Sequence, residues 1–268
     1  MVKDELVILG SGGGRHHIRT QYRGTGGFLF KFSGIQAHID PGPGAIVKLN
    51  ELNEDPTKTD LFVVTHYHLD HYNDICAIIE GSREVLHDKK KRYFKKGTLI
   101  TTRQVLRYIS EYHQNMLARK VIFHPGEVLQ YRPDIKLIGT RIEHADTDGF
   151  GLKFILKDYT LTYTSDTVVF EGLAKQYNGT DILMVNLLRP DSVYCKRHLC
   201  TDELVPYLNK ITPIPKAIIL THFGAYMDSG YSKRNFVSSQ VEKIKQLTDI
   251  DNIIAAEDGL RIQLKDLL

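Results

Sequence analysis

The stretch Thr65-His66-Tyr67-His68-Leu69-Asp70-His71 places four strong metal ligands within six residues. It follows directly on the apolar run 60–65 (DLFVVT), which is typical of a fully buried strand, so the ligands lie in a loop at a strand end. Imidazole nitrogen and carboxylate oxygen are common ligands of zinc and related ions. Because so many polar ligands in one short loop have little structural use, the stretch predicts a metal site.

The spacing within this loop bears on the number of ions. In an extended chain His66 and His68 share one face, because side chains alternate along a strand. Asp70 and His71 are adjacent, so the same argument makes them diverge, which suits two ions better than one.

Three further ligand-type residues end other apolar runs: His144 follows KLIGTRIE, Asp166 follows YTLTYTS and His222 follows AIILT. Taken singly, each is more often a surface, turn or hydrogen-bonded residue. The cluster needs partners from elsewhere, however, and we expect all seven residues to converge. The chain has 12 histidines, and we assign no role to the six outside these motifs and His198, namely His16, His17, His38, His87, His113 and His124.

Strands come first along the chain and later alternate with helices, which favours sheets packed under helices in several layers. The pattern predicts strands over 6–9, 27–33, 35–40, 60–65, 136–143, 151–156, 159–164, 181–188 and 217–221. Apolar residues at helical spacing predict helices over 105–112, 170–177 and 237–247. No repeat or linker interrupts residues 1–268, so we expect a single domain.

Bulk composition excludes several classes of protein. Of the 268 residues, 42% are hydrophobic, and the net charge of +3 is too small to demand a nucleic-acid partner. No apolar run is long enough to cross a bilayer and the start lacks the layout of a secretion signal, so we expect a cytoplasmic protein with no membrane partner. The three cysteines (Cys76, Cys195 and Cys200) do not suggest a disulfide framework.

Three other motifs have competing interpretations. The loop 10–14 (GSGGG) lacks dinucleotide-binding spacing and a following helix, which excludes NAD and favours a turn near the metal edge. Cys195-x-x-His198-x-Cys200 is either part of a separate zinc site or, with no fourth ligand evident, a pair of free thiols. The basic segment 89–96 (KKKRYFKK) is either a solvated surface loop or a lid that attracts a phosphorylated substrate.

The motifs carried by His66, His68, Asp70, His71, His144, Asp166 and His222, with the turn 39–44 (IDPGPG), resemble the metallo-β-lactamase superfamily of hydrolases. The resemblance runs from Leu6 to Arg261 and implies an α/β fold, a four-layer αββα sandwich with metals at one edge of the sheets. It implies that His66, His68 and His144 hold one ion, that Asp70, His71 and His222 hold the other, and that Asp166 bridges them. β-Lactamases of the common zinc class have cysteine at the counterpart of that position. An aspartate there favours phosphoester or ester hydrolysis.

A narrower resemblance, carried by LVILGSGGG and RGTGGFLF, is to tRNA 3′-processing endonucleases (tRNase Z) and small cyclic-phosphate phosphodiesterases. His198, 24 residues before His222, is similar to the histidine that supplies a proton donor in those enzymes, although the acidic residue after it is displaced. The alternative is a surface histidine beside Thr201, a plausible helix N-cap. Only 21 residues separate His144 from Asp166, which leaves no room there for a tRNA-gripping arm and favours a small substrate.

The sequence therefore predicts a phosphodiesterase for a small or nucleotide-type phosphodiester, acting through a metal-bridging hydroxide, with Asp70 and His198 as catalytic residues. Two divalent ions are expected, Zn²⁺ first and Mn²⁺ as the alternative. The competing functions are lactone, thioester or carboxyl-ester hydrolysis on the same site, and a non-catalytic nucleotide- or RNA-binding module. Nucleic acid is not specifically indicated as a partner, a homodimer is an option that the superfamily suggests, and the substrate-binding residues are not identified.

Overall fold

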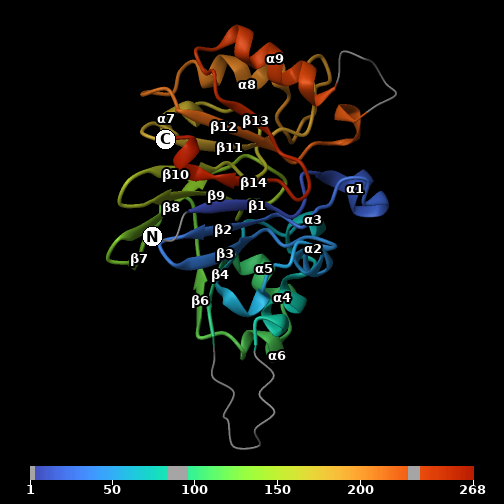
Figure 1. Cartoon of the computed structure of the whole chain (residues 1–268), viewed down its shortest axis with the longest axis vertical. Helices are drawn as coiled ribbons and strands as arrows, with labels where there is room; N and C mark the ends of the chain where they lie inside the picture. Colours follow the sequence, from blue (N-terminus) through green and yellow to red (C-terminus); the bar gives the residue numbers. More distant parts are fainter. Residues whose placement is uncertain (1–3, 84–95, 229–235) are drawn as a thin grey trace, which may run out of the picture.

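The computed structural model describes residues 4–83, 96–228 and 236–268, and its strands form two mixed seven-stranded sheets (Figure 1). The first sheet has the spatial order β14 (Arg261–Gln263), β1 (Glu5–Ile8), β2 (Phe28–Phe32), β3 (Ile35–Ile39), β4 (Thr59–Val64), β5 (Thr98–Thr101) and β6 (Arg119–Ile122). The second has the order β13 (Ile253–Ala255), β12 (Ala217–Thr221), β11 (Ile182–Asn186), β10 (Thr160–Tyr163), β9 (Phe150–Ile155), β8 (Ile135–Arg141) and β7 (Val128–Arg132).

Short helices cover the outer faces of both sheets. Those on the side of the first sheet are α1 (Gly14–Thr20), α2 (Ala45–Glu51), α3 (Leu69–Tyr72), α4 (Ile75–Gly81), α5 (Arg103–Tyr108) and α6 (Glu111–Gln114). Those on the side of the second are α7 (Leu173–Gln176), α8 (Thr201–Leu208) and α9 (Val237–Leu247). Single 3-10 turns lie at Pro56–Lys58, Ala225–Met227 and Leu264–Asp266. Among the described residues, no helix combines the length and apolar character that a bilayer crossing requires.

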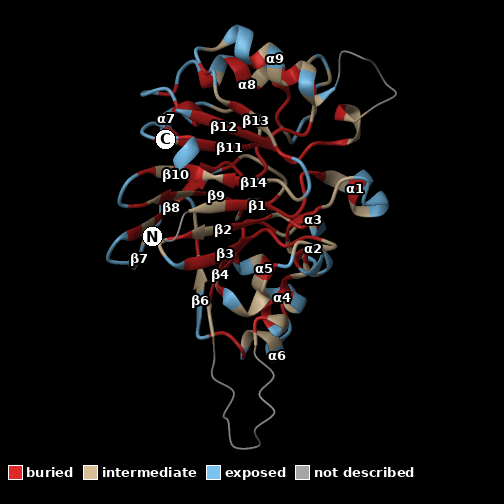
Figure 2. Ribbon diagram, in the orientation of Figure 1, coloured by how far each residue is buried: buried red, intermediate tan, exposed pale blue. Residues whose placement is uncertain are grey.

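Alternating side chains in the central strands explain the layering, since each strand buries both of its faces (Figure 2). In β1, Leu6 and Ile8 join the core between the two sheets, whereas Val7, and Leu9 directly after the strand, join the core under the helices of the first sheet. In β11, Ile182 and Met184 face the first core and Leu183 and Val185 pack under α8 and α9. The predicted αββα sandwich is thus confirmed.

Chain direction brings the ends of distant strands to one edge. Strands β3, β4, β5 and β6 run parallel to one another, and so do β10, β11, β12 and β13. Strand β8 pairs antiparallel with β9, which pairs antiparallel with β10, so β8 also points the same way as β10. Because parallel strands end at a common edge, the residues that follow β4, β8, β10 and β12 can meet in space.

Three helix predictions need correction. The helix expected over 170–177 shortens to the four residues of α7, because Gly172 before it lies in the left-handed region at φ 89°. The helix expected over 105–112 is broken: α5 ends when Ile109 turns to φ −86° and ψ 122°, and Ser110 caps α6 by accepting a bond from the amide of His113. Val105 and Ile109 are buried, but Tyr108 and Tyr112 are 54% and 62% exposed, so the apolar stripe is not a core face. A helix also does follow the loop 10–14, because α1 begins at Gly14, whose φ of +79° starts the turn.

Candidate metal centre

The ends of four strands supply the predicted ligands. His66 comes two residues after β4, His144 three residues after β8, Asp166 three residues after β10 and His222 directly after β12. His66, Asp166 and His222 are buried, and the side chain of His144 is fully covered. The structure brings together all seven residues expected from the sequence in two groups of donor atoms, and a third group joins His198 to Asp166 and His222.

The first group consists of His66, His68, His144 and Asp166. His68 Nδ1 lies 3.1 Å from His66 Nε2 and 2.9 Å from His144 Nε2. Asp166 Oδ2 lies 3.7 Å from His66 Nε2 and 3.8 Å from His144 Nε2. Tetrahedral ligands of zinc, about 2.0–2.1 Å from the ion, stand roughly 3.3 Å apart, so these four donors have the spacing of an ion cage.

The second group consists of Asp70, His71 and His222. Asp70 Oδ2 lies 3.9 Å from His71 Nε2 and 3.7 Å from His222 Nε2. Neither of those two ring nitrogens has a hydrogen-bond partner, although both are buried. Together with other residues, the three line a cavity of about 20 Å³, room for roughly one water-sized particle. Buried nitrogens without a partner are costly, so the group fits a cation that would satisfy them.

Asp166 stands between the two groups. Its Oδ2 is 3.4 Å from His71 Nε2 as well as near the first group, and its Oδ1 is 3.2 Å from His222 Nε2. Its two oxygens therefore reach donors on both sides, as the resemblance implied for a bridging ligand. Asp70 and His71 join the same group rather than diverging. The extended-chain argument for this pair is wrong because residues 69–72 form α3 rather than a strand.

Hydrogen bonds from outside the two groups fix the ligands. His71 Nδ1 lies 2.9 Å from Asp40 Oδ2, and His144 Nδ1 lies 2.7 Å from the carbonyl oxygen of Arg197. Since these Nδ1 atoms donate to oxygens, Nε2 is the nitrogen with which each imidazole faces the centre. Asn186 Nδ2 donates to Asp166 Oδ1 at 2.7 Å, which sets the orientation of the bridging carboxylate.

The loop 10–14 approaches the second group, as expected. The amide of Gly14 donates to Asp70 Oδ2 at 2.6 Å. A Cβ on Gly13 would stand 2.2 Å from His222 Nε2, so only glycine leaves room for that ring. Asp258 anchors the loop from the far end of the chain by accepting bonds from the amides of Ser11 and Gly24.

The ligand residues differ in the protonation state that their surroundings favour. Burial raises the pKa of Asp166, but His222, His71 and His198 outweigh it and hold that pKa well below its usual range. Burial, joined by the neighbouring His71, keeps the pKa of His66 well below its usual range. Both shifts favour the carboxylate and the neutral imidazole, the forms that bind a cation. His71 is the exception, since burial lowers its pKa but the carboxylates of Asp166, Asp40 and Asp70 raise it well above normal. The raised pKa favours a protonated His71 ring, and a cation bound by the second group would displace the proton from this ring.

His198 also reaches the site. The isolated bridge between Arg189 and Cys200 pairs the two ends of the 189–200 loop, and His198 Nδ1 in this loop lies 3.5 Å from Asp166 Oδ2. Burial lowers the pKa of His198 to about 4, against the opposing effect of Asp166. The helix that follows is capped at Cys200 rather than at Thr201, so the N-cap interpretation was wrong. Cys195 and Cys200 are free, and neither belongs to a ligand group found among the described residues.

Sequence reasoning missed the residues that position the ligands. Asp40 was noted only as part of a turn, and Asn186, Asp258 and the carbonyl of Arg197 were not singled out. A lone aspartate or asparagine at the end of a strand carries no specific signal, because its partner is distant in sequence. Of the basic segment 89–96, residues 89–95 lie outside the described residues, and its two interpretations stay open.

A four-layer αββα sandwich with histidines and carboxylates at the strand ends of both sheets defines the metal-dependent hydrolases of the metallo-β-lactamase fold. The chain belongs to the beta-lactamase superfamily, because the family profile described as "Beta-lactamase superfamily domain" matches residues 37–223.

Curated relatives cover most of the chain. It is 32% identical over 263 residues to an uncharacterized protein of Methanocaldococcus jannaschii, a match that spans 97% of this chain and 95% of that protein. It is 27% identical to Ribonuclease Z of Chlamydia pneumoniae, over 84% of this chain and 88% of the relative.

Solved structures share the fold at low identity. The metallo-beta-lactamase fold protein YhfI from Bacillus subtilis has a TM-score of 0.79 at 15% identity and covers 97% of this chain and 99% of its own. The short form of human tRNase Z has a TM-score of 0.71 at 15% identity, covering 96% and 98%. A diphosphatase from the PhnP family has a TM-score of 0.67 at 18% identity, covering 97% of both chains.

Proposed function

We propose that this protein hydrolyses a phosphodiester, with two divalent ions that Asp166 and the other ligand residues would hold and with His198 donating a proton to the leaving oxygen. The observation that carries the proposal is the position of Asp166 Oδ2, within 3.8 Å of donor nitrogens in both ligand groups and 3.5 Å from His198 Nδ1. Zinc suits the donor set of imidazoles and carboxylates best, and manganese is the alternative.

Two divalent ions, when bound, supply Lewis-acid stabilisation of phosphate charge and lower the pKa of water. The remaining tasks fall to residues of this chain. The ions would be held by His66, His68, His144, Asp70, His71 and His222. Asp70 would in addition hold the attacking water in line, and the Gly14 amide, 2.6 Å from Asp70 Oδ2, keeps this carboxylate in place.

His198 lies where a leaving group would be protonated. Its side chain is 18% exposed, whereas Asp166 beside it is 1% exposed, so its ring faces the side from which substrate arrives. An anionic phosphodiester next to the ring would favour its protonated form, since opposite charges stabilise each other. A proton held on the ring could then pass to the leaving oxygen.

The relationship to Ribonuclease Z of Chlamydia pneumoniae and the fold shared with a PhnP-family diphosphatase support phosphoryl chemistry over the carboxyl-ester alternative. The full set of ligands disfavours a purely binding role, because a decayed site would have lost at least one of them. A nucleotide-type substrate and a cytoplasmic location remain parts of this proposal.

The test compares bis-p-nitrophenyl phosphate with a panel of lactones, thioesters and carboxyl esters, using zinc- or manganese-loaded protein. We expect turnover of the phosphodiester and about two ions per chain by mass spectrometry, with both lost in Asp166→Ala. Asp134→Ala, an exposed carboxylate in the β7–β8 turn, serves as the matched control. Turnover confined to lactones or esters, or full activity of Asp166→Ala, would refute the proposal.

A further inference from the structure

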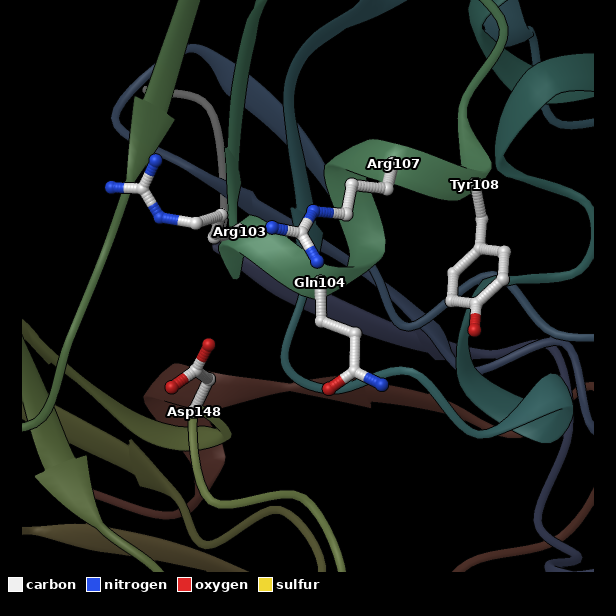
Figure 3. A pocket seen from close by; sticks show the side chains of 5 residues that line it. All are labelled: Arg103, Gln104, Arg107, Tyr108 and Asp148. Atoms are coloured by element: carbon white, nitrogen blue, oxygen red, sulfur yellow. The ribbon is translucent and has the colours of Figure 1, made fainter.

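A second cavity, of about 300 Å³, lies between α5 and the loop that carries Asp148 (Figure 3). Four of its lining residues belong to α5, namely Arg103, Gln104, Arg107 and Tyr108, and Asp148 forms part of the opposite wall. The volume is at the lower end of the range for small-molecule sites.

Three connections place this cavity next to the candidate metal centre. Val64 of β4 is in register with Thr101 of β5, so the residues that follow both strands, His66 and Arg103, emerge at the same sheet edge. The ring of Tyr108 stacks on Tyr72 of α3, the helix that carries Asp70 and His71, with ring centroids 5.4 Å apart.

The third connection is the loop after β8, which carries His144, Asp146 and Asp148. Asp146 Oδ2 accepts the amide of Tyr67, between His66 and His68, while Asp146 Oδ1 accepts the amide of Asp148. One wall of the cavity therefore belongs to the loop that carries His144.

The charge of the cavity suits an anion. Arg103 and Arg107 lie four residues apart on α5, and both are exposed. Within the described part of the chain, neither forms a salt bridge within 4.0 Å, not even with Asp148 across the cavity. Two guanidinium groups and one carboxylate leave one net positive charge. Like charges at this helical spacing repel each other, so a bound phosphate would relieve the repulsion and accept hydrogen bonds from both groups.

Tyr108 adds an aromatic surface to this cationic wall. It is 54% exposed, although its ring rests on Tyr72 at an interplanar angle of 22°. A stacked, half-exposed tyrosine next to arginines is the arrangement with which proteins hold unpaired bases and the adjoining phosphates of single strands.

We propose that Arg103 and Arg107 bind a second phosphate of the substrate and that Tyr108 stacks on a base joined to it. The substrate is then a single-stranded oligonucleotide rather than a mononucleotide cyclic phosphate. This inference rests on the proposed phosphodiesterase function. It assumes that the second phosphate belongs to the same oligonucleotide strand as the phosphodiester that is cleaved at the metal centre.

The test measures binding of a fluorescein-labelled uridine octamer with a phosphorothioate backbone, which resists cleavage, to the metal-loaded protein by fluorescence polarisation at several salt concentrations. Arg103→Gln/Arg107→Gln should weaken binding roughly tenfold or more, as expected for charge-assisted hydrogen bonds. The slope of log affinity against log salt should fall in magnitude by about 0.7 for one phosphate contact.

Matched controls separate this site from general charge. Arg132→Gln/Lys157→Gln removes two exposed cations from turns at the opposite edge of the second sheet and should change affinity less than twofold. Tyr108→Ala should weaken binding roughly fivefold or more, whereas Tyr108→Phe should not, because stacking needs only the ring.

Equal weakening in both double variants, or none in Arg103→Gln/Arg107→Gln, would overturn the subsite. So would equal weakening by Tyr108→Ala and Tyr108→Phe. Wild-type turnover of bis-p-nitrophenyl phosphate reports on the proposed function independently of these affinities. If that turnover occurs while the variants bind the octamer like the wild type, the subsite fails and the phosphodiesterase stands.

Discussion

His71 Nδ1 lies 2.9 Å from Asp40 Oδ2, and this buried bond joins the end of β3 to the second ligand group. Asp40 also accepts from the amide and hydroxyl of Thr65, at 2.7 and 2.8 Å, and from the hydroxyl of Tyr163, at 2.9 Å. The carboxylate thus orients the His71 ring and ties both sheets to the metal edge.

Replacing Asp40 with asparagine should weaken metal binding by roughly 10- to 100-fold, because the oriented, electron-rich His71 ring depends on the carboxylate. Competition with a fluorescent zinc chelator measures the affinity. Tyr163→Phe removes one donor to Asp40 but keeps the charge, so its effect should be smaller. Equal affinities of Asp40→Asn and wild type would show that His71 needs no such support.

Gly13→Ala should remove the ion held by the second group while leaving the first group able to bind. The new methyl group would stand 2.2 Å from His222 Nε2, so the ring must move out of place. Mass spectrometry of the intact protein counts the ions. Gly81→Ala, whose added Cβ would make only an ordinary contact of 3.4 Å with Ile46, is the control. Two ions bound to Gly13→Ala would contradict the close approach.

His198→Gln should lower kcat on a dinucleotide by roughly 10²- to 10⁴-fold, the usual contribution of a positioned acid. The loss should be smaller on bis-p-nitrophenyl phosphate, because nitrophenolate leaves without needing a proton. Steady-state kinetics gives kcat of the variant and of the wild type on both substrates. His113→Gln, which changes a histidine paired with Glu80, is the control. Equal losses on the two substrates would assign His198 to positioning rather than to proton transfer.

His38 should make stability depend on pH. Burial lowers its pKa from 6.5 to about 4, and its Nε2 lies 3.0 Å from the carbonyl oxygen of Gly26. The unfolded chain takes up a proton near pH 6.5, but the folded chain does so only near pH 4. Protonation therefore favours unfolding, and stability is full above pH 6.5 and is lost as the pH falls toward 4.

Between pH 6.5 and pH 4, the wild type should lose about 3 kcal/mol more of its free energy of unfolding than His38→Gln does. The glutamine keeps a donor to Gly26 but does not titrate. Urea unfolding at pH 7 and pH 4 measures the free energy of unfolding of both proteins. A chelator is present to remove metal ions, so that the ligand residues titrate alike in each protein. Parallel pH dependences would mean that His38 is not the titrating group.

Strand positions and ligand identities were readable because they leave local signals. Apolar runs such as DLFVVT and AIILT are long enough to mark buried strands, and the structure places β4 and β12 over them within one residue. The helix expected over 105–112 failed for a local reason too. Ser110 caps a new helix, and its hydroxyl competes with the continuing backbone bonds.

The sequence by itself determined the layered fold and the seven residues that gather at its edge, since residue type and the period of buried positions are written along the chain. Tertiary structure alone decided that Asp40 orients the ring of His71. It alone brought His198 over Asp166 and Arg103 beside the ligand loops. These contacts join segments tens of residues apart or more, and they depend on strand register and chain direction, which no local pattern records.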